Sequence, residues 1–248
     1  MFSKTESEIF SRNGAEYKSR DPQRDCRYTD GGYWSIFGEN FESYLNDFRL
    51  VDGDGKLPDI INKIASKHKP VIVDLLAPTN TIADITYTIR GLRRIKGLAV
   101  GLGDTRCEDV RLLDKAFGID YIPTDLKVFQ NFNKISEWLG PDKADLIMER
   151  GYGALEIMPT NLRYQYRVIN VIWKMLDTSG GLALLQLPPL RDLHENEIPV
   201  EEWASEVKRS GIYSQYLPSY ESKEPRRSYG LLMLQKNSPE EKLPTLYR

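Results

Sequence analysis

The chain has 248 residues, enough for one large α/β domain with a full hydrophobic core but tight for two. Its hydrophobic share of 40% and charged share of 28% are ordinary for a globular protein and exclude a largely disordered or fibrous chain. With 34 basic and 36 acidic residues, the formal net charge is -2, so no overall field favours nucleic acid or an anionic membrane.

The cysteine and histidine content gives no sign of a disulfide framework or a metal site. Cys26 and Cys107 are far apart and have no second pair, which fits a reducing compartment. His68 and His194 have no partners at metal-ligand spacing. The first residues contain no apolar signal core, and no run approaches the roughly 20 apolar residues of a spanning helix. We therefore expect a cytoplasmic protein that contacts no membrane.

Residues 1–56 are polar and rich in turn residues, which predicts an N-terminal arm or cap. Large apolar residues within it partly fit a short helix and predict docking onto the main body. We favour plain packing over a substrate-facing aromatic surface, because aromatic side chains supply much of the buried area of a core. The apolar residues are Tyr33, Trp34, Ile36, Phe37, Phe41, Tyr44, Leu45 and Phe48.

From residue 71 onward, short apolar runs alternate with longer patterns of helical period, which is typical of strands and helices around a largely parallel sheet. Strands are predicted at 71–76, 98–102, 119–122, 144–148, 182–187, 212–217 and 229–235. Helices are predicted at 57–67, between successive strands up to the fifth, and at 200–210, whereas a charged loop joins the last two strands. The pattern predicts a main domain over 57–236 and a tail over 237–248. The helix after the second strand is expected to point Val110, Leu113, Ala116 and Phe117 inward.

Acidic residues stand at or near the ends of the first three predicted strands: Asp74, Asp104 and Asp125. Aspartate is common at such places simply because it satisfies free backbone amides, and for Asp74 and Asp125 that structural role stays open. For Asp104 we favour a ligand role, because it ends an apolar strand at the edge where α/β sheets bind ligands.

The order of these features resembles class I S-adenosylmethionine-dependent methyltransferases over roughly residues 70–236. The likeness depends on the opening strand with Asp74, on Asp104 thirty positions later, on the turn with Asp125, on the helix stop and strand at 177–186, and on the final pair of strands. The resemblance implies a Rossmann-like α/β fold with a seven-stranded, mostly parallel sheet and a C-terminal antiparallel strand.

The same resemblance implies S-adenosylmethionine as cofactor, held beside Asp74, Thr79, Asn80, Asp104 and Asp125. It also places a methyl acceptor, a small molecule or a protein of unknown identity, at the turn after the fourth strand.

That fourth turn contains Glu149, Arg150 and Tyr152, with glycines at 151 and 153 that permit close approach. A solvated ion pair or a helix-entry cap is the alternative for Glu149 and Arg150. Methyl transfer needs a base only where the acceptor must lose a proton, so no catalytic residue is assigned.

The first turn departs from the family pattern. Three glycines of the family are replaced by Leu76, Pro78 and Asn80. Glycine there lets backbone amides approach the ligand and adopts positive φ without strain, and Pro78 removes one amide donor. This favours, as the alternative, a methyltransferase-fold scaffold or partner-binding protein whose cofactor pocket has decayed.

A second enzymatic alternative is a nicotinamide- or flavin-dependent Rossmann enzyme. It would use residues 101–106 as a degenerate dinucleotide fingerprint, with Asp120 or Asp125 on the ribose. Arg106 stands where the third glycine belongs, so we rank this reading below the other two.

Overall fold

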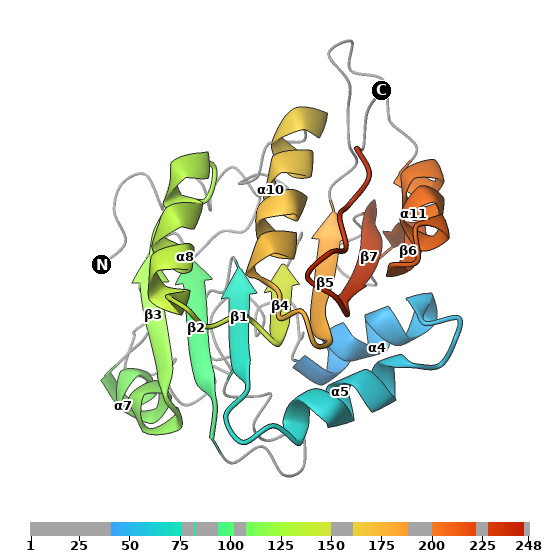
Figure 1. Ribbon diagram of the computed structural model, residues 1–248. Coiled ribbons are helices and arrows are strands. Elements are labelled where there is room, and N and C mark those ends of the chain that lie inside the picture. The colour runs from blue at the N-terminus through green and yellow to red at the C-terminus, as the bar shows by residue number, and fades with distance from the viewer. Residues whose placement is uncertain are drawn as a thin grey trace.

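The computed structural model describes residues 41–75, 82, 94–101, 108–149, 161–187, 200–221 and 228–245. Helices and strands alternate along most of this part of the chain (Figure 1). In chain order the elements are α4 (Phe41–Val51), α5 (Leu57–Ala65), β1 (Val71–Leu75), β2 (Lys96–Gly101), α7 (Glu108–Phe117), β3 (Ile119–Pro123), the 3-10 helix η1 (Phe129–Asn131), α8 (Phe132–Leu139), β4 (Leu146–Glu149), α10 (Leu162–Met175), β5 (Gly181–Leu187), α11 (Val200–Arg209), β6 (Tyr213–Glu221) and β7 (Ser228–Lys236).

The strands form one seven-stranded sheet in the order β3-β2-β1-β4-β5-β7-β6. Neighbours from β3 to β5 pair in parallel, whereas β7 is antiparallel to both β5 and β6. The Rossmann-like fold class predicted from the sequence, with its C-terminal antiparallel strand, is therefore confirmed. The strand order reverses between β1 and β4, and open α/β sheets bind ligands beyond the carboxyl ends of the strands at such a point.

A hydrophobic core fills each face of the sheet. On one face, α8, α10 and α11 pack on alternate residues of the strands, and α8 and α10 lie in front of the sheet in Figure 1. On the other face, α4 and α5 pack on the remaining residues, with Phe117 of α7 against the same core. Both faces are covered, which is why every residue of the central strands β1, β4 and β5 is buried rather than every second one.

The helix α4 belongs to the core, although the sequence placed it in an N-terminal arm. Phe41 and Phe48 are fully buried, and Tyr44 is 1% exposed. The packing interpretation of these aromatic residues is confirmed for the described part of the arm. The other four apolar residues predicted to dock, at 33, 34, 36 and 37, lie outside the described residues.

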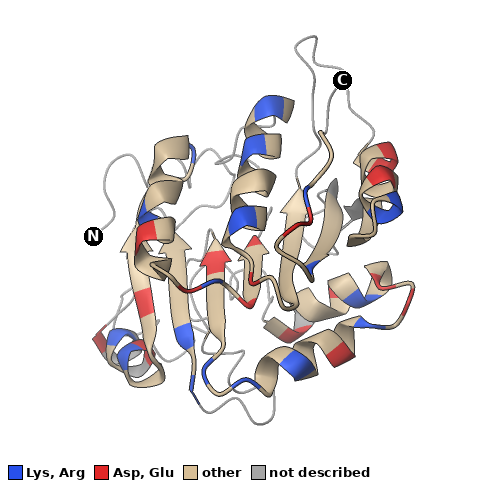
Figure 2. Cartoon of the chain, viewed as in Figure 1, with Lys and Arg blue, Asp and Glu red and all other residues tan. Residues whose placement is uncertain are grey.

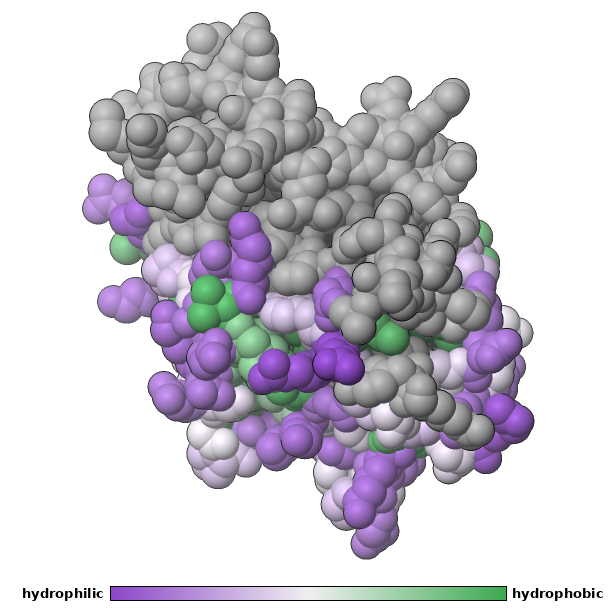
Figure 3. Space-filling view, turned by 90° about the horizontal axis from the view of Figure 1, so that it is seen from above, coloured by the Kyte–Doolittle hydropathy of each residue, from purple (hydrophilic) through white to green (hydrophobic). Residues whose placement is uncertain are grey.

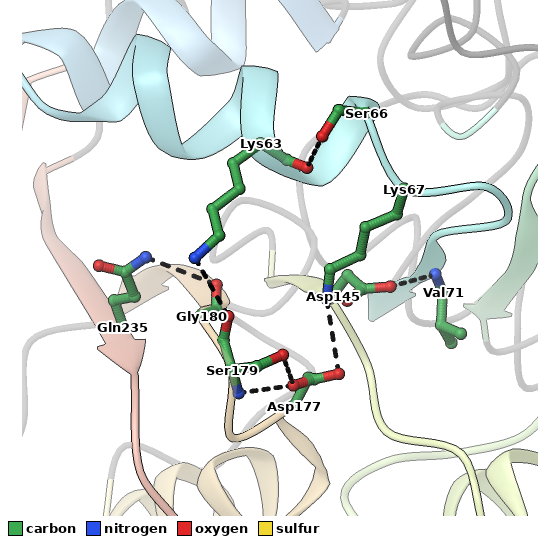
Figure 4. Close-up of polar contacts among 9 residues, drawn as sticks. All are labelled: Lys63, Ser66, Lys67, Val71, Asp145, Asp177, Ser179, Gly180 and Gln235. Carbon is green, nitrogen blue, oxygen red and sulfur yellow. Dashed lines mark hydrogen bonds and ion pairs between the residues drawn. The ribbon is translucent and has the colours of Figure 1, made fainter.

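A cluster of hydrogen bonds and ion pairs joins the amino ends of the central strands (Figure 4). Lys67, which follows α5, contacts the carboxylates of Asp145 and Asp177. Asp145 accepts a hydrogen bond from the backbone N–H of Val71 at 2.7 Å, and Asp177 accepts one from Ser179 N at 2.6 Å. The starts of β1, β4 and β5 are thus held by one group of charges.

The segment 237–245 lies against α10 and α11 instead of extending from the fold. Leu243 is 9% exposed and belongs to the core of that face. The indole N–H groups of Trp173 and Trp203 donate to the carbonyl oxygens of Glu241 and Pro244, at 3.1 and 2.9 Å. We call residues 237–245 the C-terminal strap.

The orientation predicted for α7 is wrong in one respect. Ala116 is exposed, whereas Asp114 is 2% exposed and faces inward. Because α7 buries the polar residue Asp114, which makes further contacts within the protein, apolar periodicity alone does not predict which face of α7 points inward. Gly118 ends α7 with a φ of 78°, as predicted, because a left-handed residue there suits glycine.

Candidate functional site

The carboxyl ends of β1 and β4 meet at the point where the strand order reverses. Leu75 is level with Glu149 and Asp74 with Met148, so the ends of the two strands are aligned. Acidic residues mark both ends (Figure 2). The chain therefore brings two of the predicted site residues, Asp74 and Glu149, to one edge of the sheet.

Glu149 is the most unusual side chain at this edge. It is fully buried, and its neighbours in register, Leu75 on β1 and Leu185 on β5, are buried and apolar. Within the described part of the protein, neither carboxyl oxygen has a hydrogen-bond partner. Burial raises the pKa of Glu149 to about 8, so the carboxyl is mostly protonated at pH 7.

An isolated buried carboxyl is costly, because a polar group without a hydrogen bond loses its hydration and gains nothing in return. Such groups gather at functional sites, where a bound ligand supplies the missing partner. Glu149 can therefore give or accept a hydrogen bond with a ligand that reaches the ends of β1 and β4.

Asp74 occupies the opposite face of the sheet from Glu149. Side chains alternate along a strand, and Asp74 has the parity of Ile72, which packs in the α4 and α5 core. Glu149 has the parity of Ile147, which packs in the α8 and α10 core. Asp74 is fully buried. The two carboxyl groups thus lie at the same edge but do not face each other.

Asp125 follows β3 and shapes its own turn. Its carboxylate accepts a hydrogen bond from Lys127 N at 2.9 Å, and its carbonyl accepts one from the side-chain amide of Asn131 at 2.7 Å. This is the local bonding expected of an aspartate that organises a turn. The structural role that the sequence left open for Asp125 is therefore present, whatever else the residue does.

Tyr164 is a member of this site that the sequence did not indicate. The N-cap residue Asn161 accepts hydrogen bonds from the backbone N–H groups of Arg163 and Tyr164, which fixes the first turn of α10. The Tyr164 hydroxyl donates to the carbonyl of Leu126. Burial, together with the charges of Glu149 and Asp125, raises the pKa of Tyr164.

Tyr164 therefore lies within electrostatic reach of both Glu149 and Asp125, and its hydroxyl bonds the backbone just after β3. Its one signal in the sequence was an aromatic residue three positions after a capping asparagine. Next to it, the Phe129 ring stands edge-on to Tyr164 with centroids 6.3 Å apart, and the Arg167 guanidinium lies 3.8 Å from the Phe129 centroid.

Five of the predicted site residues lie outside the described residues: Thr79, Asn80, Asp104, Arg150 and Tyr152. The cofactor and acceptor roles expected of them stay predictions. Of the groups that the structure does describe, the partnerless carboxyl of Glu149 fits a ligand at this edge.

On the described surface, large apolar side chains are few. Viewed onto the carboxyl ends of the strands, the described surface is mainly hydrophilic, with apolar areas that are small (Figure 3). The large apolar residues that are exposed are Leu50, Leu112 and Val128, counted over the described ranges alone. Across those same ranges, no group of three or more His, Cys, Asp or Glu could hold a metal ion, and no helix has the length and apolarity to cross a membrane.

Known proteins resemble this chain in structure only. No protein-family model matches the sequence, and no curated protein matches it. Among solved structures, a CurJ carbon methyltransferase is 13% identical over 72% of this chain and 51% of its own, with a TM-score of 0.48. An O-methyltransferase family protein from Burkholderia thailandensis is 15% identical over 95% of this chain and 71% of its own, with a TM-score of 0.41.

A third structure, the 1,6-didemethyltoxoflavin-N1-methyltransferase of the same organism with 1,6-didemethyltoxoflavin and S-adenosylhomocysteine bound, is 13% identical. The match covers 90% of this chain and 93% of that one, with a TM-score of 0.42. The solved structures named here are methyltransferases. Identity this low assigns neither an acceptor nor a site residue.

Proposed function

We propose that this chain is an S-adenosylmethionine-dependent methyltransferase-like protein that binds its acceptor beside Glu149. The observation that carries the proposal is the buried Glu149 carboxyl, which has no hydrogen-bond partner among the described residues and ends β4 at the point where the strand order reverses. A ligand that brings a hydroxyl, amine or amide to this point would remove the cost of leaving that carboxyl isolated.

The cofactor would lie beside Asp74, Thr79, Asn80, Asp104 and Asp125, and Arg150 and Tyr152 would meet the acceptor with Glu149. When bound, the cofactor supplies a methyl group on a sulfonium. The chain's own part is positioning: Glu149 holds its proton at neutral pH and orients the acceptor by a hydrogen bond, and the apolar walls of Leu75 and Leu185 keep water from it.

Isothermal titration of the whole chain with S-adenosylmethionine and S-adenosylhomocysteine tests the proposal. We expect a micromolar dissociation constant for one or both, and no heat from NAD⁺ or NADH in the same cell. Silence at millimolar S-adenosyl ligand would leave the alternative of a scaffold, which the loss of glycines at Leu76 and Pro78 favours. Heat from the nicotinamide alone would favour the alternative of a nicotinamide-dependent Rossmann enzyme.

A pair of variants locates the site. Asp104→Ala should weaken cofactor binding by about 1–3 kcal/mol, because charge-assisted hydrogen bonds to the ribose are lost. Asp142→Ala is the matched control, since its carboxylate pairs with Lys96 at the amino side of β4. Equal affinity in both variants would remove Asp104 from the site.

A further inference from the structure

The hydroxyl of Tyr44 lies at the seam between the carboxyl end of β4 and the middle of β5. It is 2.6 Å from the carbonyl oxygen of Leu184 and 3.1 Å from the carbonyl oxygen of Glu149. These partners are 140 and 105 residues away along the chain, and they belong to neighbouring parallel strands. A side chain of α4 thus joins the main chains of two strands at the last described residue of β4.

Tyr44 reaches this seam from the α4 and α5 face of the sheet, opposite the face that carries the Glu149 carboxyl. It packs in the α4 and α5 core with Met148 and Leu184. The Glu149 carboxyl has the opposite parity and lies on the α8 and α10 face, level with Leu75 and Leu185. The tyrosine therefore contacts the backbone of Glu149 without being on the same face as its side chain.

We infer that Tyr44 is a positioning residue for Glu149: its hydroxyl holds the end of β4 against β5 and so keeps the Glu149 carboxyl in a dry, fixed place. Parallel strands lose their mutual hydrogen bonds where one of them ends, and water enters at such a point unless another group bridges it. The functional meaning of this inference rests on the proposed acceptor site at Glu149.

Other residues set the charges near Glu149. The tyrosine at 164 on α10 is electrostatically coupled to Glu149, and Asp125 and Arg167 act on the same tyrosine. Among the described neighbours in register, β1 and β5 present only leucines. Replacing Tyr44 by Phe leaves these charged residues and leucines unchanged. A change in the titration midpoint of Glu149 would therefore report a change in the position and hydration of the Glu149 carboxyl.

The test follows the titration of Glu149 in the whole chain by ¹³C NMR of labelled glutamate, with the signal assigned by its loss in Glu149→Gln. In Tyr44→Phe we expect the midpoint to fall by about 1 pH unit or more, because water that enters the seam restores the charged form. Tyr213→Phe is the matched control: it removes another hydroxyl, one that bonds Asp52 Oδ1 at 2.9 Å, and should leave the midpoint unchanged.

Two results would overturn the inference. One is an equal midpoint in wild type and Tyr44→Phe. The other is an equal fall in Phe48→Leu, which loosens α4 packing but keeps the hydroxyl, because it would show a general effect of the helix. The midpoint needs no cofactor. If Tyr44→Phe shifts the Glu149 midpoint but the chain binds no S-adenosylhomocysteine, the methyltransferase proposal is refuted and the positioning role of Tyr44 stands. If the chain binds S-adenosylhomocysteine but the midpoint does not shift, the positioning role is refuted and the methyltransferase proposal stands.

Discussion

Asp145 accepts a hydrogen bond from the backbone N–H of Val71 at 2.7 Å, across 74 residues of sequence. The same carboxylate contacts Lys67, and the backbone of Asp145 accepts from Leu182 N at 2.9 Å. One residue before β4 thus fixes the starts of β1 and β5, the strands on either side of it (Figure 4).

Removing that carboxylate should destabilise the fold. We expect Asp145→Ala to lower the free energy of unfolding by about 2–3 kcal/mol, because it leaves the buried Val71 N–H without an acceptor. The lost Lys67 contact adds little, since that side chain is 30% exposed. Urea unfolding measures the loss. Asp142→Ala, which breaks an exposed pair with Lys96, should cost under about 1 kcal/mol, and equal losses would contradict the prediction.

Glu149 should make stability fall as the pH rises. Folding raises the pKa of Glu149 from 4.5 to about 8, so the folded protein binds this proton more tightly than the unfolded chain. Its contribution is complete below about pH 4.5 and is lost as the pH rises towards 8, with a slope of up to about 1.4 kcal/mol per pH unit. Glu149→Gln lacks this slope.

Urea unfolding at several pH values between about 5 and 8 should therefore show Glu149→Gln gaining on the wild type as the pH rises. Glu137→Gln, which changes an exposed glutamate on α8, should follow the wild-type profile. Parallel profiles of wild type and Glu149→Gln would show that the carboxyl is not buried in its neutral form.

Asp177 should act in the opposite direction. Burial alone would raise its pKa, but hydrogen bonds from Ser179 and the charge of Lys67 outweigh burial and lower it. Its contribution to stability is present above its unfolded pKa and is lost as the pH falls through the lower folded value. Unfolding below about pH 4 should therefore be less steep in Asp177→Asn than in wild type. Asp59→Asn, on the exposed side of α5, is the control and should unfold in acid as the wild type does. If Asp177→Asn also unfolds in acid as the wild type does, the contacts of Asp177 with Ser179 and Lys67 do not stabilise the fold.

The C-terminal strap should contribute to the stability of α10 and α11. Leu243→Ala removes a buried side chain at the edge of the core and should cost about 2 kcal/mol. Trp203→Phe keeps a ring but loses the donor to Pro244, and should cost about 1 kcal/mol. Leu112→Ala, at a residue 60% exposed, should cost under about 0.5 kcal/mol. In Leu243→Ala and Trp203→Phe, hydrogen exchange of backbone amides should accelerate first in the C-terminal strap. Unchanged protection of these amides would contradict the docking of the strap on α10 and α11.

Gly181 should tolerate no side chain. A Cβ there would lie 2.6 Å from Asp177 N and 2.9 Å from Ala144 O, and backbone atoms cannot move aside as a flexible side chain can. We expect Gly181→Ala to cost about 2–4 kcal/mol in thermal or urea unfolding. Gly53→Ala, with no atom within 4 Å of the added carbon, should change stability by under about 0.5 kcal/mol. A neutral Gly181→Ala would mean that β5 starts further from Asp177 than the structure places it.

The sequence predicted the order and type of the elements because strands and helices have different apolar periods. The ends differ by up to four residues, since pairing decides them. For example, β2 begins at Lys96 and not at 98, because Lys96 is level with Val71 and its N–H donates to Pro70 O. The exposed Ala116 shows the same limit for α7, where a buried Asp114 takes part of the inward face.

By itself, the sequence determined the α/β architecture and placed Asp74 and Glu149 at strand ends, since both follow from local patterns of apolar residues. Only the tertiary structure decided that these two carboxyl groups lie on opposite faces, that Leu75 and Leu185 surround Glu149, and that Tyr44 and Tyr164 approach it from two distant helices. The physical reason is that burial and the resulting pKa depend on neighbours that are far apart in the chain and meet only when the sheet assembles.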